Sequence, residues 1–171
     1  MDASGASVTR PWAPSHAQWY IDQLSEADIQ RFTTESMDTT VDQFGDALAL
    51  LTADQDQFGR AIIDPDSGSL VGNLAASRDR NTASVAYWIA EGMRGRGLAR
   101  RAVAECCGWI EQRWPQVQQA RLFIHPDNAA SIRVAWASGF TRDPSLDKVI
   151  EVRGDQRPMH AYVRQLRIVD A

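Results

Sequence analysis

The spacing of apolar residues in the first third of the chain is helical. In residues 40–51 the apolar positions recur every three or four residues, at Val41, Phe44, Leu48 and Leu51. This spacing predicts a helix with one face on the core. Residues 9–32 predict a short strand and then helical turns, for which Ser15 or Ser25 is a candidate cap. Apolar contacts in this part come from Trp19, Leu24, Ile29 and Phe32.

After Asp54 the pattern changes to short apolar runs separated by turn residues. The runs cover residues 58–63, 70–77 and 82–90, and short segments rich in Asp, Asn, Pro and Gly separate them. Strands joined by such short turns pair with their neighbours in the chain, because a parallel connection needs a dozen or more residues. The sequence therefore predicts an antiparallel meander.

The second half alternates between helical and extended patterns. Residues 98–114 predict a helix whose apolar stripe consists of Leu98, Ala102, Val103, Cys106, Trp109 and Ile110. A strand at 121–125 and a helix at 128–138 follow, and Gly139 is a plausible C-cap of that helix. Residues 149–152 and 160–166 are strand-like, and we expect them to be antiparallel neighbours.

Composition indicates a single domain of ordinary globular character. The chain has 171 residues and a formal charge of −4, which disfavours general affinity for nucleic acid. Its cysteines, Cys106 and Cys107, are adjacent, so we expect buried reduced thiols and no zinc site. No signal peptide or apolar span is evident, which predicts a cytoplasmic protein. Residues 1–8 are small and polar and predict a flexible terminus, with the domain at 9–171.

The segment 85–101 carries the strongest chemical signal in the sequence. It predicts a strand, a turn with glycines and arginines, and the start of a helix. The first N–H groups of a helix have no partner within the helix, and its dipole favours an anion there. Gly97 lets the main chain approach such an anion, and Arg94 and Arg96 add positive charge. We therefore predict a diphosphate site.

Other phosphate-binding motifs do not fit this turn. A dinucleotide-binding G-x-G-x-x-G needs glycine at position 100 and a parallel β-α-β unit, but the residue is Arg100 and the preceding strands form a meander. A P-loop requires Gly-Lys-Ser/Thr, which the sequence lacks. A turn with solvated arginines is the structural alternative.

The spacing Arg94-x-x-Gly97-x-Ala99 resembles the acyl-CoA pyrophosphate loop of the GNAT superfamily of N-acetyltransferases. A second segment starts at His125-Pro126 and includes Asn128, Ser131 and Arg133, followed by Gly139-Phe140. It resembles the H-P-x-N-x-x-S-x-R…G-F segment of the RimJ/RimL-like branch. The resemblance covers residues 57–166 and implies an α+β fold with α/β/α layers. Its central sheet would be mixed and mainly antiparallel, with helices on both faces.

The resemblance also implies the function. We expect an acyltransferase that transfers an acetyl group from acetyl-CoA to a primary amine, either a protein N-terminus or a small molecule. The expected acetyl-CoA-binding residues are Tyr87, Trp88, Ile89, Arg94, Gly95, Arg96, Gly97, Leu98, Ala99, Asn128 and Ser131. No metal is expected, and a homodimer is possible. The alternatives are a non-catalytic acyl-CoA-binding module on the same fold and, disfavoured by the net charge, a nucleic-acid-binding protein.

Some catalytic roles can be assigned by the resemblance and others stay open. A main-chain N–H between Tyr87 and Ile89 would stabilise the oxyanion. Many GNAT members carry a tyrosine acid four residues before Gly-Phe, but this chain has Ala135 there. Ser131 matches the serine proposed to act on the leaving thiolate in the RimJ/RimL-like branch, unless it only satisfies a backbone carbonyl. Asn128 would bind the pantetheine arm, cap its own helix, or both.

The general base is not identified by the sequence. An amine must lose a proton before it attacks a thioester. The candidate bases are Glu91, His125, Glu35, Asp38 and Asp42, and a water chain is an alternative. Three tryptophans could shape an acceptor cleft (Trp12, Trp19 and Trp88), whereas three others lie at helical core spacing (Trp109, Trp114 and Trp136).

Overall fold

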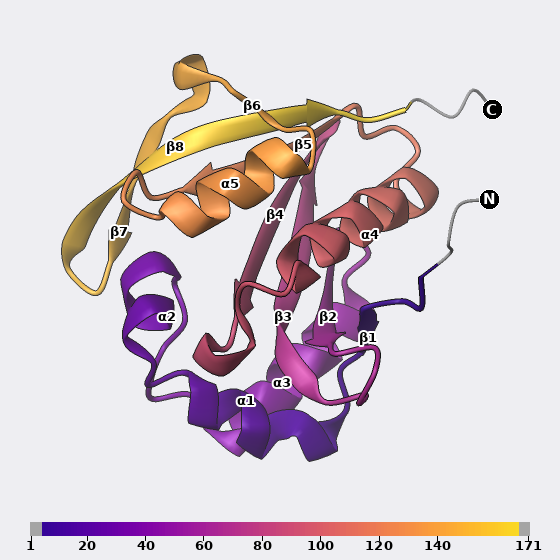
Figure 1. The fold of residues 1–171 in the computed structure, drawn as a ribbon, viewed down its shortest axis with the longest axis vertical. Coiled ribbons are helices and arrows are strands. Elements are labelled where there is room, and N and C mark those ends of the chain that lie inside the picture. Colours follow the sequence, from indigo (N-terminus) through magenta and orange to yellow (C-terminus); the bar gives the residue numbers. More distant parts are fainter. Residues whose placement is uncertain (1–4, 168–171) are drawn as a thin grey trace.

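A computed structural model describes residues 5–167 and has a mixed sheet at its centre (Figure 1). The sheet order is β1-β2-β3-β4-β5-β8-β6, with β7 paired to β8. The strands are β1 (Thr9–Pro11), β2 (Gln57–Ile63), β3 (Leu70–Asp79), β4 (Thr82–Ile89), β5 (Gln119–Ile124), β6 (Thr141–Arg142), β7 (Lys148–Val152) and β8 (Asp155–Gln165). The predicted meander is confirmed, because β2, β3 and β4 pair antiparallel in chain order.

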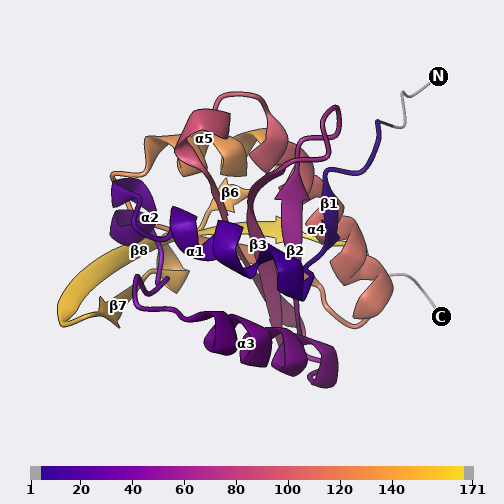
Figure 2. The same cartoon turned by 90° about the horizontal axis from the view of Figure 1, so that it is seen from below.

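Helices cover both faces of this sheet, as expected (Figure 2). They are α1 (Ala17–Gln23), α2 (Ala27–Phe32), α3 (Val41–Ala53), α4 (Leu98–Arg113) and α5 (Ala129–Ala137). Helices α4 and α5 lie on one face, whereas α3 lies on the opposite face (Figure 2). Short 3-10 turns, η1 (Pro14–His16), η2 (Glu91–Met93) and η3 (Pro144–Leu146), complete the elements.

The pairing between β4 and β5 is the feature that positions the site. These two strands are parallel, and their register covers only Thr82–Val85 against Gln119–Leu122. Strand β4 continues to Ile89 and stays paired to β3 as far as Gly72. The sheet therefore opens between β4 and β5 beyond Val85.

The main core lies between the sheet and α4. Buried residues of the α4 stripe include Leu98, Val103, Cys106 and Ile110, and the neighbouring Cys107 is buried with them. The prediction of core positions was wrong for Trp109 and Trp136, which are 41% and 61% exposed. Trp109 lies at the edge of the stripe, where the Arg60 guanidinium stacks on its ring. Trp114 is buried, as predicted.

The N-terminal third is helical, but its caps and its apolar face differ from the prediction. Neither Ser15 nor Ser25 caps a helix, because the N-cap positions of η1, α1 and α2 are Ala13, His16 and Glu26. In α3 the side chain of Thr40 caps the first turn by accepting from the N–H of Gln43. Of the predicted α3 stripe only Phe44 is buried, whereas Val41 is 53% exposed.

The C-terminal strands β7 and β8 are antiparallel neighbours, as expected, but the predicted turn at 153–158 is mostly strand: residues 155–158 pair with 149–152, whereas residues 160–165 pair with β5. Val152 pairs with Asp155, so the connection consists of two residues, Arg153 and Gly154. Both have positive φ, 52° and 84°, as a two-residue hairpin turn of type I′ requires. At the other end, Val8 is fully buried, and its N–H donates to Glu105 on α4 at 2.7 Å. Residues 1–4 of the predicted flexible terminus lie outside the described part of the chain.

None of the helices within residues 5–167 combines the length and the apolar character that crossing a membrane requires.

Candidate active site

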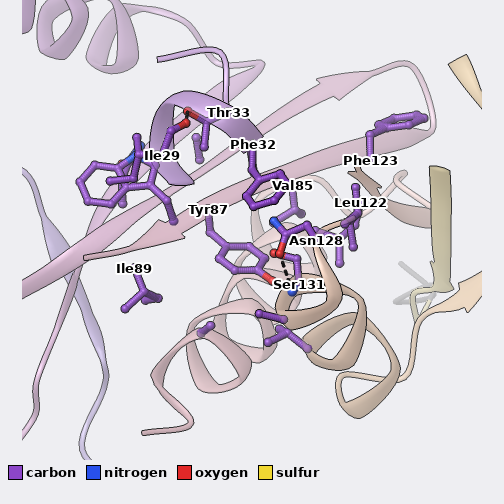
Figure 3. A pocket seen from close by; sticks show the side chains of 18 of the residues that line it. Ile29, Phe32, Thr33, Val85, Tyr87, Ile89, Leu122, Phe123, Asn128 and Ser131 are labelled. Atoms are coloured by element: carbon purple, nitrogen blue, oxygen red, sulfur yellow. Dashed lines mark hydrogen bonds between the residues drawn. The ribbon is translucent and has the colours of Figure 1, made fainter. Parts of the chain in front are cut away.

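A cavity of about 910 Å³ runs through the opening between β4 and β5. Its lining includes the loop 93–100, both faces of β4 at residues 84–89, and the start of α5. The lining continues to α2, the segment 33–35 and the β7–β8 hairpin. The cavity therefore connects the α4 side of the sheet with the α2 side. Figure 3 shows its lining from close by.

The loop before α4 has the geometry of an anion-binding turn. Gly95 and Gly97 adopt φ angles of 76° and 74°, which side chains rarely tolerate. A Cβ added at either glycine would meet no atom within 4 Å, so both positions face open space. Gly97 is the N-cap of α4 and offers no side-chain cap to the free N–H groups. Leu98 is buried beneath this turn, and Ala99 packs beside it.

The two loop arginines are paired with carboxylates of the chain. Arg94 Nη1 donates to Asp28 Oδ2 at 3.0 Å, its Nη2 pairs with Glu26, and its Nε donates to the carbonyl of Ile89 at 3.0 Å. Arg96 Nη2 donates to Asp64 Oδ2 at 2.8 Å. The N–H of Asp66 and the guanidinium of Arg96 together lower the pKa of Asp64. Arg94 thus spans from the loop to α2.

On the α4 side of the sheet, three predicted residues come together (Figure 3). Asn128 is the N-cap of α5, and its Oδ1 accepts from the N–H of Ser131 at 3.1 Å. Tyr87 points from β4 toward Ser131 (Figure 3). The Tyr87 hydroxyl is buried and has no hydrogen-bond partner among residues 5–167. All three residues line the cavity, so Asn128 both caps its helix and faces the site.

Trp88 and Ile89 follow Tyr87 at the open edge of β4. The N–H of Ala90 donates to the carbonyl of Val71 on β3, so alternation along the strand turns the main chain of Ile89 and Tyr87 toward β5. The Ile89 carbonyl accepts a hydrogen bond from Arg94 Nε, which confirms that the main chain of Ile89 faces away from β3. The Trp88 side chain lies on the opposite face, packed with Leu24 and Ile29.

A carboxylate lies on the α2 side of the same opening. Glu35 Oε1 accepts from the Trp88 indole at 3.0 Å and from Asn73 Nδ2 at 3.4 Å. Burial, with the negative charge of Glu35 beside it, raises the pKa of Tyr20. The hydrogen bonds from Trp88 and Asn73 both use Oε1, and the hydroxyl of Tyr20 is also hydrogen-bonded to this carboxylate. Glu35 lines the cavity.

The main chain around Glu35 is held by the β7–β8 hairpin. Arg153 donates to the carbonyls of Gln30 and Glu35, at 2.7 Å and 2.6 Å. Arg157 donates to the carbonyls at the end of α2, those of residues 30, 31 and 33. These carbonyls have no partner within the helix, so the two arginines cap α2.

The structure distinguishes the other candidate bases by whether they line the cavity. His125 lines the cavity, and its Nδ1 accepts from the N–H of Asp127 at 3.2 Å. Glu91, Asp38 and Asp42 are exposed and are not part of the lining. Of the three tryptophans proposed for a cleft, only Trp88 lines the cavity, whereas Trp12 and Trp19 pack against other aromatic rings.

A model of the acetyltransferase (GNAT) domain family matches residues 8–141 of this chain. The match covers more than half of the 171 residues. The chain belongs to the GNAT acetyltransferase family. This GNAT protein is therefore an acyltransferase enzyme, and the resemblance found in residues 57–166 identified the correct family. No curated protein sequence matches the chain.

Solved structures share the fold of this GNAT protein at low sequence identity. The ribosomal-protein-S5-alanine acetyltransferase from Vibrio fischeri has a TM-score of 0.78 and 16% identity, over 92% of this chain and 91% of that chain. A spermidine N-acetyltransferase from Vibrio cholerae, solved with CoA and spermine, has a TM-score of 0.77 and 13% identity, over 92% and 94%. RimJ from Mycobacterium smegmatis, solved with CoA-disulfide, has a TM-score of 0.73 and 20% identity, over 92% and 80%.

Several residues of this GNAT site could not be found from the sequence. Tyr87 was expected among the acetyl-CoA-binding residues and near the main-chain oxyanion donor, with no role for its hydroxyl, which points at Ser131 (Figure 3). Arg153 and Arg157 lie more than a hundred positions from the carbonyls that they bind. In the sequence, these two arginines stand out only as charged residues of a turn-rich segment. Glu26 and Asp28 carried no signal, because a carboxylate near the start of a helix is common.

Proposed function

We propose that this acyltransferase binds acetyl-CoA on the α4 side of the opening and a primary amine on the α2 side. The observation that carries the proposal is the single cavity through the sheet, with a glycine turn at one end and a carboxylate at the other. The turn at Gly95 and Gly97 leaves room for a diphosphate beside free N–H groups. The unpartnered Tyr87 hydroxyl indicates a polar ligand in the opening.

The chain's own groups supply a reaction path. Acetyl-CoA would bring the activated acetyl thioester. Main-chain N–H groups of Tyr87 or Ile89, turned toward the opening, donate to the oxyanion that develops. The hydroxyl of Ser131, with that of Tyr87 beside it, donates a hydrogen bond to the departing sulfur. Residues 95–99 would hold the diphosphate, and Asn128 would bind the pantetheine arm.

Glu35 is the group we assign to the acceptor amine. Its Oε2 can accept from an ammonium group, while Trp88 and Asn73 fix the position of Oε1. A carboxylate in this place attracts the protonated amine and takes its proton, directly or through water, before the attack. We do not assign this role to His125, because its Nδ1 already accepts a hydrogen bond from the main-chain N–H of Asp127.

The lining favours an acceptor with one ammonium group over a polyamine. Its acidic residues on the α2 side are Asp28 and Glu35, and Asp28 is paired with Arg94. The same side carries Lys148 and Arg157, together with Arg31, which is paired with Asp127. Further ammonium groups would be repelled there, whereas an N-terminal peptide or a small monoamine would not.

A turnover screen tests the proposal. Acetyl-CoA is mixed with N-terminal peptides, monoamines, polyamines and aminoglycosides, and release of free thiol is measured. We expect turnover with a peptide or a monoamine and little with spermidine. Binding of CoA in calorimetry without thiol release for any amine would instead support the non-catalytic acyl-CoA-binding module.

A further inference from the structure

All three nitrogens of the Arg94 guanidinium are hydrogen-bonded to other groups of the chain. Nη1 binds Asp28, Nη2 binds Glu26, and Nε binds the carbonyl of Ile89. The side chain is 34% exposed, and that of Glu26 is 15% exposed, so this pair is partly removed from water. A phosphate ligand at Arg94 would have to displace charge-assisted hydrogen bonds that are already made.

Glu26 extends this connection beyond Arg94. It is the N-cap residue of α2, and its Oε2 accepts from the N–H of Glu91 at 3.0 Å. Its carboxylate therefore joins the start of α2 both to Arg94 and to η2, the turn that leads from β4 to the glycine loop. Glu26 is not part of the cavity lining, unlike Asp28 and Ile29.

Helix α2 is thus attached at both ends by arginines from other elements. Arg94 holds the first turn, and Arg157 and Arg153 hold the last carbonyls. A helix of 6 residues has little stability of its own, so these contacts decide where it lies. Its residues Ile29 and Phe32 wall the α2 side of the cavity, and Glu35 follows directly.

We propose that Arg94 is a positioning residue for the acceptor side of the site, rather than a phosphate ligand. Arg94 connects the glycine loop and Ile89 to the start of α2. It therefore fixes where α2 lies, and with it the position of Glu35 on the acceptor side of the cavity. The diphosphate is left to the main-chain N–H groups after Gly95 and to Arg100, since Arg96 is itself paired with Asp64. This inference rests on the proposed function for its kinetic readout.

The test compares three variants of the full chain. Arg94→Gln removes the connection from the loop, and Glu26→Gln removes it from α2 without touching the cavity. Arg142→Gln is the control, because Arg142 also pairs with an aspartate, Asp147 at 2.5 Å, but lies outside the lining. For each variant the KM of the acceptor amine, kcat and the Kd of CoA are measured.

We expect Arg94→Gln and Glu26→Gln each to raise the acceptor KM about tenfold, with little change in the Kd of CoA. The double variant should lose no more than the larger single loss, because both changes break one connection. Arg142→Gln should leave all three constants unchanged. A large rise in the Kd of CoA for Arg94→Gln, with the acceptor KM unchanged, would overturn the proposal and make Arg94 a phosphate ligand.

Hydrogen exchange gives a readout that does not depend on turnover. The amides of α2 should lose protection in Arg94→Gln and Glu26→Gln, and should keep it in Arg142→Gln. Should the wild-type protein acetylate no amine, the proposed function fails, and this exchange pattern together with the Kd of CoA still decides the role of Arg94. Full α2 protection in Arg94→Gln would contradict it.

Discussion

The Tyr87 phenol on β4 points at Ser131 on α5, across the opening in the sheet (Figure 3). Burial raises the pKa of Tyr87 to about 12, so its hydroxyl keeps its proton at neutral pH. In the position where many family members have a tyrosine acid, this chain has the fully buried Ala135. We therefore assign the hydrogen bond to the leaving sulfur to Ser131 and the adjacent Tyr87.

Replacing Ser131 by alanine should slow turnover without weakening cofactor binding. We expect kcat to fall roughly ten- to a hundredfold, the worth of one hydrogen bond to a charged group. Tyr87→Phe should have a smaller effect, and the double variant should lose less than the product of the two, because the hydroxyls act as a unit. Steady-state kinetics and CoA calorimetry measure this. Equal losses in kcat and in CoA affinity would make Ser131 a binding residue.

Filling the glycine turn should abolish CoA binding. In Gly97→Trp the indole would occupy the open space beside the N-terminus of α4. Gly68→Trp is a matched control, because Gly68 has a φ of 72°, also faces open space and lies outside the lining. Both variants bear the same backbone strain, so circular dichroism should show a retained fold in both. CoA affinity that survives in Gly97→Trp would place the diphosphate elsewhere.

Neutralising Glu35 should weaken the acceptor side alone. Glu35→Gln keeps an oxygen for the donors of Trp88 and Asn73 but cannot pair with an ammonium or take its proton. We expect kcat/KM for the amine to fall roughly a hundredfold or more, with CoA affinity unchanged. Asp38→Asn, three residues along and outside the lining, should have no effect. Wild-type kinetics in Glu35→Gln would assign the proton transfer to another group.

The two adjacent thiols should be inert in the folded protein. Burial raises the pKa of Cys107 to about 11 and that of Cys106 well above its usual range. A thiol with that pKa is only about 0.1% thiolate at pH 8, so an aromatic disulfide reagent should react with neither until denaturant is added. Rapid reaction of the native protein would show that the α4 core opens.

The raised pKa values of the two thiols also predict how the free energy of unfolding depends on pH. Above about pH 8.5 the unfolded thiols ionise, whereas the folded ones keep their protons, so the unfolded state binds fewer protons. The free energy of unfolding should therefore decrease as the pH rises toward 11. Urea titrations of the wild type and of a Cys106→Ala/Cys107→Ala variant would test this, and the variant should have the shallower slope.

Local patterns predicted most of the helices and strands of this protein. The meander and the α4 and α5 helices follow from interactions between near neighbours in the chain, such as strand alternation and the helical apolar stripe. Predictions that depended on the tertiary surroundings of a residue were less accurate. Trp109 and Trp136 fit a core spacing, yet they lie exposed at the edge of their helices, because the width of the covering sheet decides where a stripe ends.

The tertiary structure alone decided the partners of the charged groups. Arg94 and Asp28 are 66 positions apart, and Arg153 and Glu35 are 118 apart, so no local pattern relates them. Charge pairing carries no sequence period, because it depends on which elements the fold brings side by side. The sequence by itself determined that the chain contains a glycine turn before a helix and which family it resembles. The opening between β4 and β5, with Glu35 on one side and Ser131 on the other, arises only when strands distant in the chain pair and then part.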